Sequence, residues 1–189
     1  MRPAVFLDRD GTLIEENGYL DRLKNLSLFP YTPDALRLLN RAGFATVVIT
    51  NQGAIGREII DEAFLHTVHA AIDTRLAAGR ARIERYYFCP HHPDATIPAL
   101  RQVCGCRKPA AGMIERACRE MGLDPARSVM VGDRWLDVRC GQAAGTRSVL
   151  VRTGHGEFDE MHPSGDVRAD AILNNLMEAV GWILRNSSR

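Results

Sequence analysis

The chain has 189 residues, of which 46% are hydrophobic and 25% are charged, and its formal net charge is +1. These proportions suit a globular protein with a hydrophobic core, and the near-neutral charge gives no electrostatic reason to expect nucleic acid or an anionic membrane as partner. No apolar run approaches the roughly 20 residues that cross a bilayer, and no secretory signal is recognisable. We therefore expect a cytoplasmic protein with no membrane partner.

Strand-like and helix-like segments alternate along the chain. In chain order, the pattern predicts a strand over 4–7, a helix over 33–42 with Thr32 as N-cap, a strand over 44–49, a helix over 61–78, a strand over 83–88, a helix over 110–121, a strand over 128–133, a helix over 135–144, strands over 146–151 and 170–173, and a helix over 176–184. The segment 153–168 is predicted to be a surface loop. This alternation is typical of an α/β fold, a doubly wound and mainly parallel sheet with helices on both faces.

Three polar residues fall at or just after predicted strand ends: Asp8, Thr50 and Asp133. In an open parallel sheet the carboxyl ends of the strands share one edge, and ligands bind in the crevice there. We therefore expect these three side chains to meet in one site. We expect residues 1–189 to form a single domain.

A pair of carboxylates follows the first strand, in the segment from Asp8 to Leu13. Asp8 and Asp10 are two residues apart, and such close like charges require a cation or a shared proton. This suits a division of labour in which one carboxylate is a nucleophile and Mg²⁺ ligand and the other handles a proton. A solvated Asp-x-Asp turn is the alternative reading of this pair alone.

Cysteine and histidine, two metal-ligating residue types, cluster between positions 89 and 106. Cys89 and His91 form one short pair, and Cys104 and Cys106 form another. Three thiolates and one imidazole make a closed tetrahedral set that is typical of structural zinc, although spacing alone does not separate His91 from His92. A zinc-binding loop over 89–106 would order the joining segment and hold the following arginine and lysine over the crevice.

The residues in sequence order resemble the four motifs of the haloacid dehalogenase superfamily of phosphohydrolases. The motifs are Asp8-x-Asp10-Gly11-Thr12-Leu13, then Thr50, Lys108 and Asp133. The resemblance implies a Mg²⁺-dependent phosphatase that forms an aspartyl-phosphate on Asp8, with Asp10 as acid and base, and Thr50 and Lys108 around the phosphoryl group. The Mg²⁺ ligands would be Asp8, Asp133 and the backbone carbonyl of Asp10. Whether Asp137 also reaches the metal is left open. The superfamily usually covers its site with a cap domain, but the gaps after Asp10 and Gly53 are short, so we expect no separate cap domain here.

The metal loop is similar to that of one branch, the D-glycero-D-manno-heptose 1,7-bisphosphate 7-phosphatases. The resemblance implies a bacterial enzyme that acts on a small sugar bisphosphate and makes heptose 1-phosphate for lipopolysaccharide, capsule or glycoprotein sugars. Separately, the sequence shows no obvious coiled coil, so we expect a monomer. The implied substrate contacts are Glu16, Asn17, Gly18, Tyr19, Asn51, Gln52, Gly53, Arg107 and Arg134. The chain departs from the branch pattern at 53–58 and at Arg134, where lysine is frequent, so the preferred anomer stays open.

Three other functions are compatible with parts of the pattern. Histidinol-phosphate phosphatases share the four motifs, but their metal loop is shorter than the segment from His92 to Val103. A receiver-type phosphoacceptor would also use a strand-end Asp, a Thr and a Lys, but Asp10 would shorten the life of its phosphorylated form. A zinc-stabilised binding module would leave the order of the four motifs unexplained.

Overall fold

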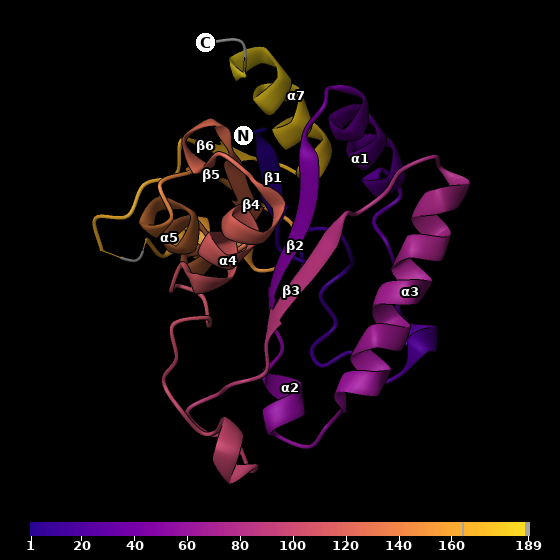
Figure 1. The fold of residues 1–189 in the computed structure, drawn as a ribbon, viewed down its shortest axis with the longest axis vertical. Helices are drawn as coiled ribbons and strands as arrows, with labels where there is room; N and C mark the ends of the chain where they lie inside the picture. The colour runs from indigo at the N-terminus through magenta and orange to yellow at the C-terminus, as the bar shows by residue number, and fades with distance from the viewer. Residues whose placement is uncertain (164, 188–189) are drawn as a thin grey trace.

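Six parallel strands form one sheet in the computed structural model, which describes residues 1–163 and 165–187 (Figure 1). Across the sheet the order is β3 (Arg85–Cys89), β2 (Ala45–Asn51), β1 (Ala4–Leu7), β4 (Val129–Gly132), β5 (Arg147–Val151) and β6 (Ala171–Leu173). All five strand pairs are parallel. The chain first builds outward from β1 to β3 and then crosses to β4 on the other side of β1. The strand order therefore reverses between β1 and β4, where open α/β sheets bind ligands.

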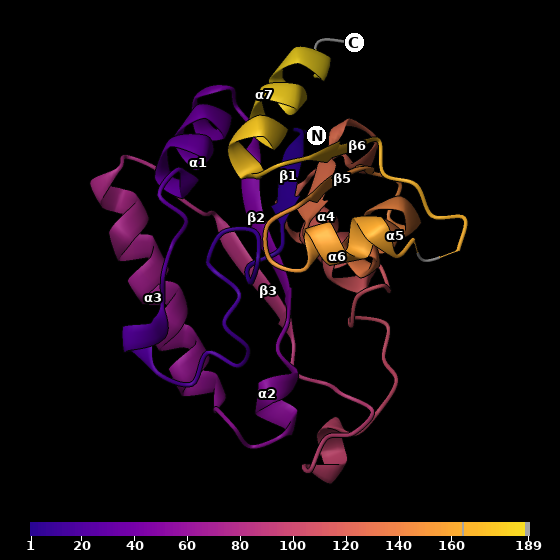
Figure 2. The same cartoon turned by 180° about the vertical axis from the view of Figure 1, so that it is seen from behind.

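Helices cover both faces of the sheet, as Figures 1 and 2 show from opposite sides. Val5 and Leu7 of β1 belong to one core cluster, with residues of α1 (Thr32–Arg41), α3 (Glu62–Ala78) and α7 (Leu176–Asn186). Ala4 and Phe6 belong to a second cluster, with residues of α4 (Gly112–Met121) and α5 (Trp135–Ala143). Because successive side chains of a strand point to opposite faces, a strand buried on both sides is apolar throughout. The predicted fold class is confirmed.

Most predicted elements are present, with shifted ends. The helix expected after Thr32 includes it as first residue, so the predicted N-cap is wrong: Tyr31 holds that position, and the Thr32 hydroxyl donates to the carbonyl of Leu13 at 2.9 Å. β2 extends through Asn51, which places Thr50 within the strand. A short helix, α2 (Gly53–Gly56), follows it.

The predicted loop over 153–168 contains a helix, α6 (Gly156–Met161), so that prediction is wrong. A contact with α5 explains the difference. The buried carboxylate of Asp159 accepts a hydrogen bond from the Trp135 backbone N–H at 2.7 Å, and its carbonyl accepts one from the Trp135 indole N–H. The segment is ordered by a partner 24 positions earlier in the chain, which local sequence does not reveal.

No part of the described chain forms a separate cap over the sheet, in agreement with the sequence-based expectation. The long segment after β3, which contains a 3₁₀ turn at Pro98–Leu100, extends beyond the carboxyl ends of the strands (Figure 1). Across the described residues, every helix is too short or too polar to cross a bilayer.

We expect Asp159→Ala to lower the free energy of unfolding by about 1–3 kcal/mol, because the buried Trp135 N–H loses its acceptor. Urea unfolding measures this change. Glu157→Ala is the control, since Glu157 lies on the same helix and is exposed. Equal effects of the two substitutions would contradict the assignment of the order in α6 to the Asp159 contact.

Candidate active site

Asp8 lies at the first position after β1, where the strand opens onto the crevice. Its backbone N–H donates to the carbonyl of Val131 in β4 at 2.9 Å, so the pairing of β1 with β4 continues into Asp8. The residue is only 8% exposed. One carboxylate oxygen accepts from the Arg9 backbone N–H at 2.7 Å. Its carboxylate is thus fixed at the switch point of the sheet.

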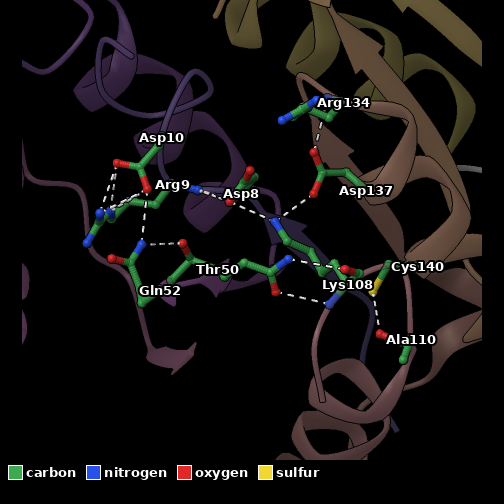
Figure 3. Close-up of polar contacts among 11 residues, drawn as sticks. Asp8, Arg9, Asp10, Thr50, Gln52, Lys108, Ala110, Arg134, Asp137 and Cys140 are labelled. Atoms are coloured by element: carbon green, nitrogen blue, oxygen red, sulfur yellow. Dashed lines mark hydrogen bonds and ion pairs between the residues drawn. The ribbon is translucent and has the colours of Figure 1, made fainter. Parts of the chain in front are cut away.

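Lys108 lies between two carboxylates (Figure 3). Its Nζ is 2.8 Å from an oxygen of Asp8 and 2.6 Å from an oxygen of Asp137, and the lysine is 3% exposed. Burial alone would lower the pKa of Lys108, but the charges of Asp137 and Asp8 outweigh it and raise the pKa above its usual value. Lys108 is therefore a permanent cation beside Asp8.

Asp137 is fully buried on the first turn of α5, and both of its oxygens have partners. One faces Lys108, and the other accepts from the Arg134 backbone N–H at 3.1 Å. A Cβ on Gly132 would lie 2.3 Å from the Asp137 Cβ, so the chain can approach this closely only with glycine there. The sequence left the role of Asp137 open, and this geometry makes it an anchor for Lys108.

The side chain of Asn51 fixes the main chain of the lysine. Its Oδ1 accepts from the Lys108 backbone N–H at 3.0 Å, and its Nδ2 donates to the Lys108 carbonyl at 3.1 Å. Asn51 ends β2, so the lysine is tied to the sheet although 57 positions separate the two residues. The second N–H of the Asn51 amide and the backbone of Asn51 remain for contact with a substrate.

Asp133 supplies a third buried carboxylate, immediately after β4. It is 1% exposed, and Oδ2 accepts from the His155 backbone N–H at 2.8 Å. Two glycines pack against this oxygen: a Cβ on Gly11 or on Gly154 would lie 2.2 Å from it. Both glycines have positive φ, +76° and +59°, a conformation that other residues rarely adopt.

The three buried carboxylates are suited to a divalent cation. Asp8, Asp133 and Asp137 each offer an oxygen, and these atoms all lie within 4.8 Å of one another. Burial, followed by Asp137 and Asp10 and opposed by Lys108, raises the pKa of Asp8 to about 7. Burial and the charge of Asp8 likewise raise the pKa of Asp133. A hard cation such as Mg²⁺ binds carboxylate oxygens and would offset this repulsion, so the residues fit the metal that the sequence predicts.

Asp10 faces away from this cluster, toward Arg9 and Gln52 (Figure 3). Both carboxylate oxygens pair with the Arg9 guanidinium, with Nη2 at 2.9 Å from each. Gln52 Nε2 donates to Asp10 Oδ2 at 3.1 Å and to Thr50 Oγ1 at 2.9 Å. Because Thr50 accepts this bond, its hydroxyl hydrogen is available to a ligand.

A pocket of about 360 Å³ opens over these residues. Thirteen of the fourteen residues predicted around the catalytic and substrate sites line it: Asp8, Asp10, Glu16, Gly18, Tyr19, Thr50, Asn51, Gln52, Gly53, Arg107, Lys108, Asp133 and Arg134. Asn17, predicted as a substrate contact, is exposed and lies outside the lining. The sequence reasoning did not assign Arg9 and His155, which also line the pocket. Arg9 lies between Asp8 and Asp10 in the sequence, and this position alone could have indicated that it belongs to the site.

A second cluster brings together the predicted zinc ligands Cys89, His91, Cys104 and Cys106. The three sulfur atoms lie 3.2–3.5 Å apart, and His91 Nδ1 is 3.3 Å from Cys106 Sγ. Three thiols and one imidazole that converge in this way fit a tetrahedral zinc ion. His92 does not join them: its ring lies against Gly53 and near the Arg57 guanidinium. The structure thus separates the two histidines that spacing left equivalent.

The metal loop is connected directly to the pocket. Arg107 follows Cys106 and donates from Nη1 to the carbonyl of His91 at 2.9 Å. A Cβ on Gly53 would be 3.1 Å from the His92 ring, so a larger residue there would press on this loop. Glu58 has φ +57° and accepts from the Thr96 hydroxyl at 2.8 Å. Both ends of the segment 53–58, which departs from the branch pattern, therefore lie at contacts with this loop.

The raised pKa of Asp8 predicts how pH affects the protein without Mg²⁺. Between its unfolded value of 3.8 and about 7, the folded state holds a proton that the unfolded state has lost. We therefore expect stability to fall as pH rises through this window, by up to about 1.4 kcal/mol per pH unit for one such proton. Urea unfolding from pH 4 to 8 tests this, with Asp8→Asn as control. An identical pH slope in the two proteins would contradict the prediction.

Known proteins resemble this chain along nearly its whole length. A family model described as HAD-hydrolase-like matches residues 105–179. The D-glycero-β-D-manno-heptose-1,7-bisphosphate 7-phosphatase of Escherichia coli K12 is 41% identical over 178 residues, 93% of this chain and 91% of that protein. The protein of the same name from Haemophilus ducreyi is 35% identical over 184 residues, 96% of this chain and 98% of that protein.

A solved structure agrees with these sequence relatives. The D,D-heptose 1,7-bisphosphate phosphatase of B. bronchiseptica, crystallised with magnesium and phosphate, has a TM-score of 0.85 and 26% identity, and the match covers 98% of this chain and 99% of that chain. The fold, the geometry of the motif residues and the relatives all indicate the same family. The chain belongs to the D-glycero-β-D-manno-heptose-1,7-bisphosphate 7-phosphatase family of haloacid dehalogenase-like hydrolases.

Proposed function

We propose that this protein removes the 7-phosphate of D-glycero-β-D-manno-heptose 1,7-bisphosphate and yields heptose 1-phosphate for nucleotide-activated heptose biosynthesis, which serves lipopolysaccharide, capsule or glycoprotein sugars. The observation that carries the proposal is Asp8, a buried carboxylate held by Lys108 at the floor of a polar pocket. The curated relatives named for this substrate carry the β designation, which favours the β anomer.

Asp8 is the nucleophile in this proposal. Its free oxygen attacks phosphorus, the bond to the sugar oxygen breaks, and an aspartyl-phosphate forms. Lys108 and the Thr50 hydroxyl face the charge that gathers on the phosphoryl oxygens. Asp10 gives its proton to the departing sugar oxygen and then takes one from the water that opens the aspartyl-phosphate. Asp10 therefore returns to its starting state after each turnover.

The ligands of Mg²⁺ would be carboxylate oxygens of Asp8 and Asp133 and the backbone carbonyl of Asp10. Bound Mg²⁺ supplies positive charge against the phosphoryl oxygens and allows the clustered carboxylates to stay ionised. Asp137 is left out of this set because Lys108 and the Arg134 N–H already occupy its two oxygens. Its part is to hold Lys108 beside Asp8.

The second phosphate of the substrate requires its own cations, and two arginines at the pocket are available. Arg107 is anchored by one N–H to the carbonyl of His91, which leaves its other donors for a ligand. The side chain of Arg134 is 47% exposed at the start of α5. A guanidinium grips a phosphate through two parallel hydrogen bonds, so this pair supports recognition of a bisphosphate. Glu16, Gly18 and Tyr19 would contact the sugar.

Steady-state kinetics with purified protein and Mg²⁺ tests the substrate. We expect the highest kcat/KM for the β anomer of the heptose bisphosphate, with the α anomer and histidinol phosphate at least about tenfold lower, which corresponds to about 1.4 kcal/mol of transition-state binding. Asp8→Asn is the control and should release no phosphate. A preference for histidinol phosphate would replace the substrate assignment, and turnover by Asp8→Asn would remove the nucleophile.

We infer that the cluster of Cys89, His91, Cys104 and Cys106 holds structural zinc, because four protein ligands fill a tetrahedral shell and leave no open position for catalysis. We expect Cys104→Ser to lose bound zinc and thermal stability while the Mg²⁺ concentration for half-maximal activity changes little. Elemental analysis, thermal unfolding and Mg²⁺ titration measure the three effects. Ser148→Ala, a buried change away from the loop, is the control for stability alone. Fully active, zinc-free wild-type protein would contradict the inference.

A further inference from the structure

Arg9 stands between the two motif aspartates and is buried beneath the pocket, with 3% of its side chain exposed. Its Nε lies 3.2 and 3.1 Å from the two oxygens of Asp10, and its Nη2 lies 2.9 Å from both. Its Nη1 is buried and has no hydrogen-bond partner among the described residues. Within the described chain, every hydrogen bond of this guanidinium recorded in the structure therefore goes to Asp10.

Among the described residues, Asp10 is the one acidic group within ion-pair distance of Arg9, and the charge of Arg9 also acts on Glu16 without forming an ion pair. The charge of Arg9 acts on His69 of α3 as well, where burial and then Arg9 lower the pKa to about 3, so that histidine stays neutral at physiological pH. His69 and Tyr86 of β3 stack with ring centroids 4.1 Å apart. A buried cation is costly without an opposite charge nearby. Arg9 is thus stable in this place because Asp10 is there, and the orientation of each depends on the other.

A second donor holds the same carboxylate from another element. Gln52, which follows β2, donates to Asp10 Oδ2 at 3.1 Å and is 4% exposed. Arg9 meets both oxygens of Asp10 through Nε and Nη2, and the Gln52 amide adds a donor from another element, so the carboxylate is held from two directions. Asp10 itself remains 22% exposed and lines the pocket. It is therefore the accessible end of an otherwise buried polar arrangement.

We propose that Arg9 is a positioning residue that orients Asp10 for proton transfer to the leaving oxygen of the substrate. Arg9 exchanges no proton and contacts no reacting atom; it holds the carboxylate through Nε and Nη2. Small displacements of a proton donor cost large factors in rate, so a rigid grip is useful where the leaving group is a sugar oxygen that must be protonated. This inference rests on the acid role given to Asp10 in the proposed function.

A structural ion pair is the competing explanation, and the chain contains a matched example. Arg152 meets Glu160 through the same two nitrogens, although as a parallel fork, with Nε–Oε2 at 2.6 Å and Nη2–Oε1 at 2.8 Å. That pair is partly exposed, with 37% and 31% of the side chains accessible, and neither residue lines the pocket. Breaking it removes an arginine–carboxylate pair without touching Asp10.

The test compares two substrates that differ in their need for an acid. The heptose bisphosphate releases an alkoxide-like oxygen that requires a proton, whereas p-nitrophenyl phosphate releases a stabilised phenolate that does not. The ratio kcat/KM reports steps up to release of the leaving group. We expect Arg9→Met to lower kcat/KM for the sugar substrate by about 10²-fold, the lower range of general acid catalysis, and for the aryl phosphate by less than about fivefold.

Four further proteins complete the experiment: Asp10→Asn, the double variant of Asp10→Asn and Arg9→Met, Arg9→Lys and Arg152→Met. In an Asp10→Asn background, adding Arg9→Met should change neither value, because Arg9 acts through Asp10. Arg9→Lys keeps a positive charge but not the two-pronged grip, and it should lie between wild type and Arg9→Met; this variant carries the test if Arg9→Met does not fold. Arg152→Met should leave both substrates unchanged.

The outcomes separate this inference from the proposed function. Equal losses of Arg9→Met or Arg9→Lys on both substrates, or a full additional loss in the Asp10→Asn background, would show a structural role and overturn the inference. If Asp10→Asn itself fails to discriminate between the two substrates, the acid role of Asp10 in the proposed function is wrong. Thermal unfolding of each variant establishes that the comparison is made on folded protein.

Discussion

The site depends on one electrostatic constraint, a group of three carboxylates that share a buried volume with a single lysine. Asp8, Asp133 and Asp137 are at most 8% exposed, and Lys108 is the cation among them. Three negative charges and one positive charge leave an excess that burial makes expensive, as the raised pKa values of Asp8 and Asp133 reflect. A divalent cation would balance this excess. The proposed chemistry uses the same charges whose mutual repulsion the burial makes expensive.

The sheet creates this constraint because it reverses its strand order between β1 and β4. Asp8 and Asp133 follow these neighbouring strands directly, and the register places Leu7 beside Val131. Glycines leave space for the acidic side chains, because a Cβ at these positions would collide with them. Gly132 packs against Asp137, and Gly11 and Gly154 pack against an oxygen of Asp133. Backbone proximity therefore positions the carboxylates, and few side-chain contacts are needed to hold them.

The loop after β3 joins the Cys/His cluster to the cations of the pocket. Its cluster could hold a metal ion, and the segment is tied to the turn at α2, where the Gly56 carbonyl accepts from the backbone N–H groups of Thr96 and Ile97. The same loop leads into Arg107 and Lys108. Because the two cations directly follow the loop in the chain, a change that destabilises the loop should also displace them. The pocket is correspondingly open toward solvent on the side of Tyr19, which is 49% exposed.

The sequence by itself determined the fold class, the four motif residues and the metal loop. Strands buried on both faces must be apolar throughout, helices packed on one face must be amphipathic, and residues at the ends of parallel strands must meet at one edge, so local pattern carried this information. Only the tertiary structure decided which histidine joins the cysteines, that Asp137 anchors Lys108, that Asp10 turns to Arg9, and that α6 is helical. Each of these depends on partners distant in the chain or on the direction of a side chain, and neither is encoded in local spacing.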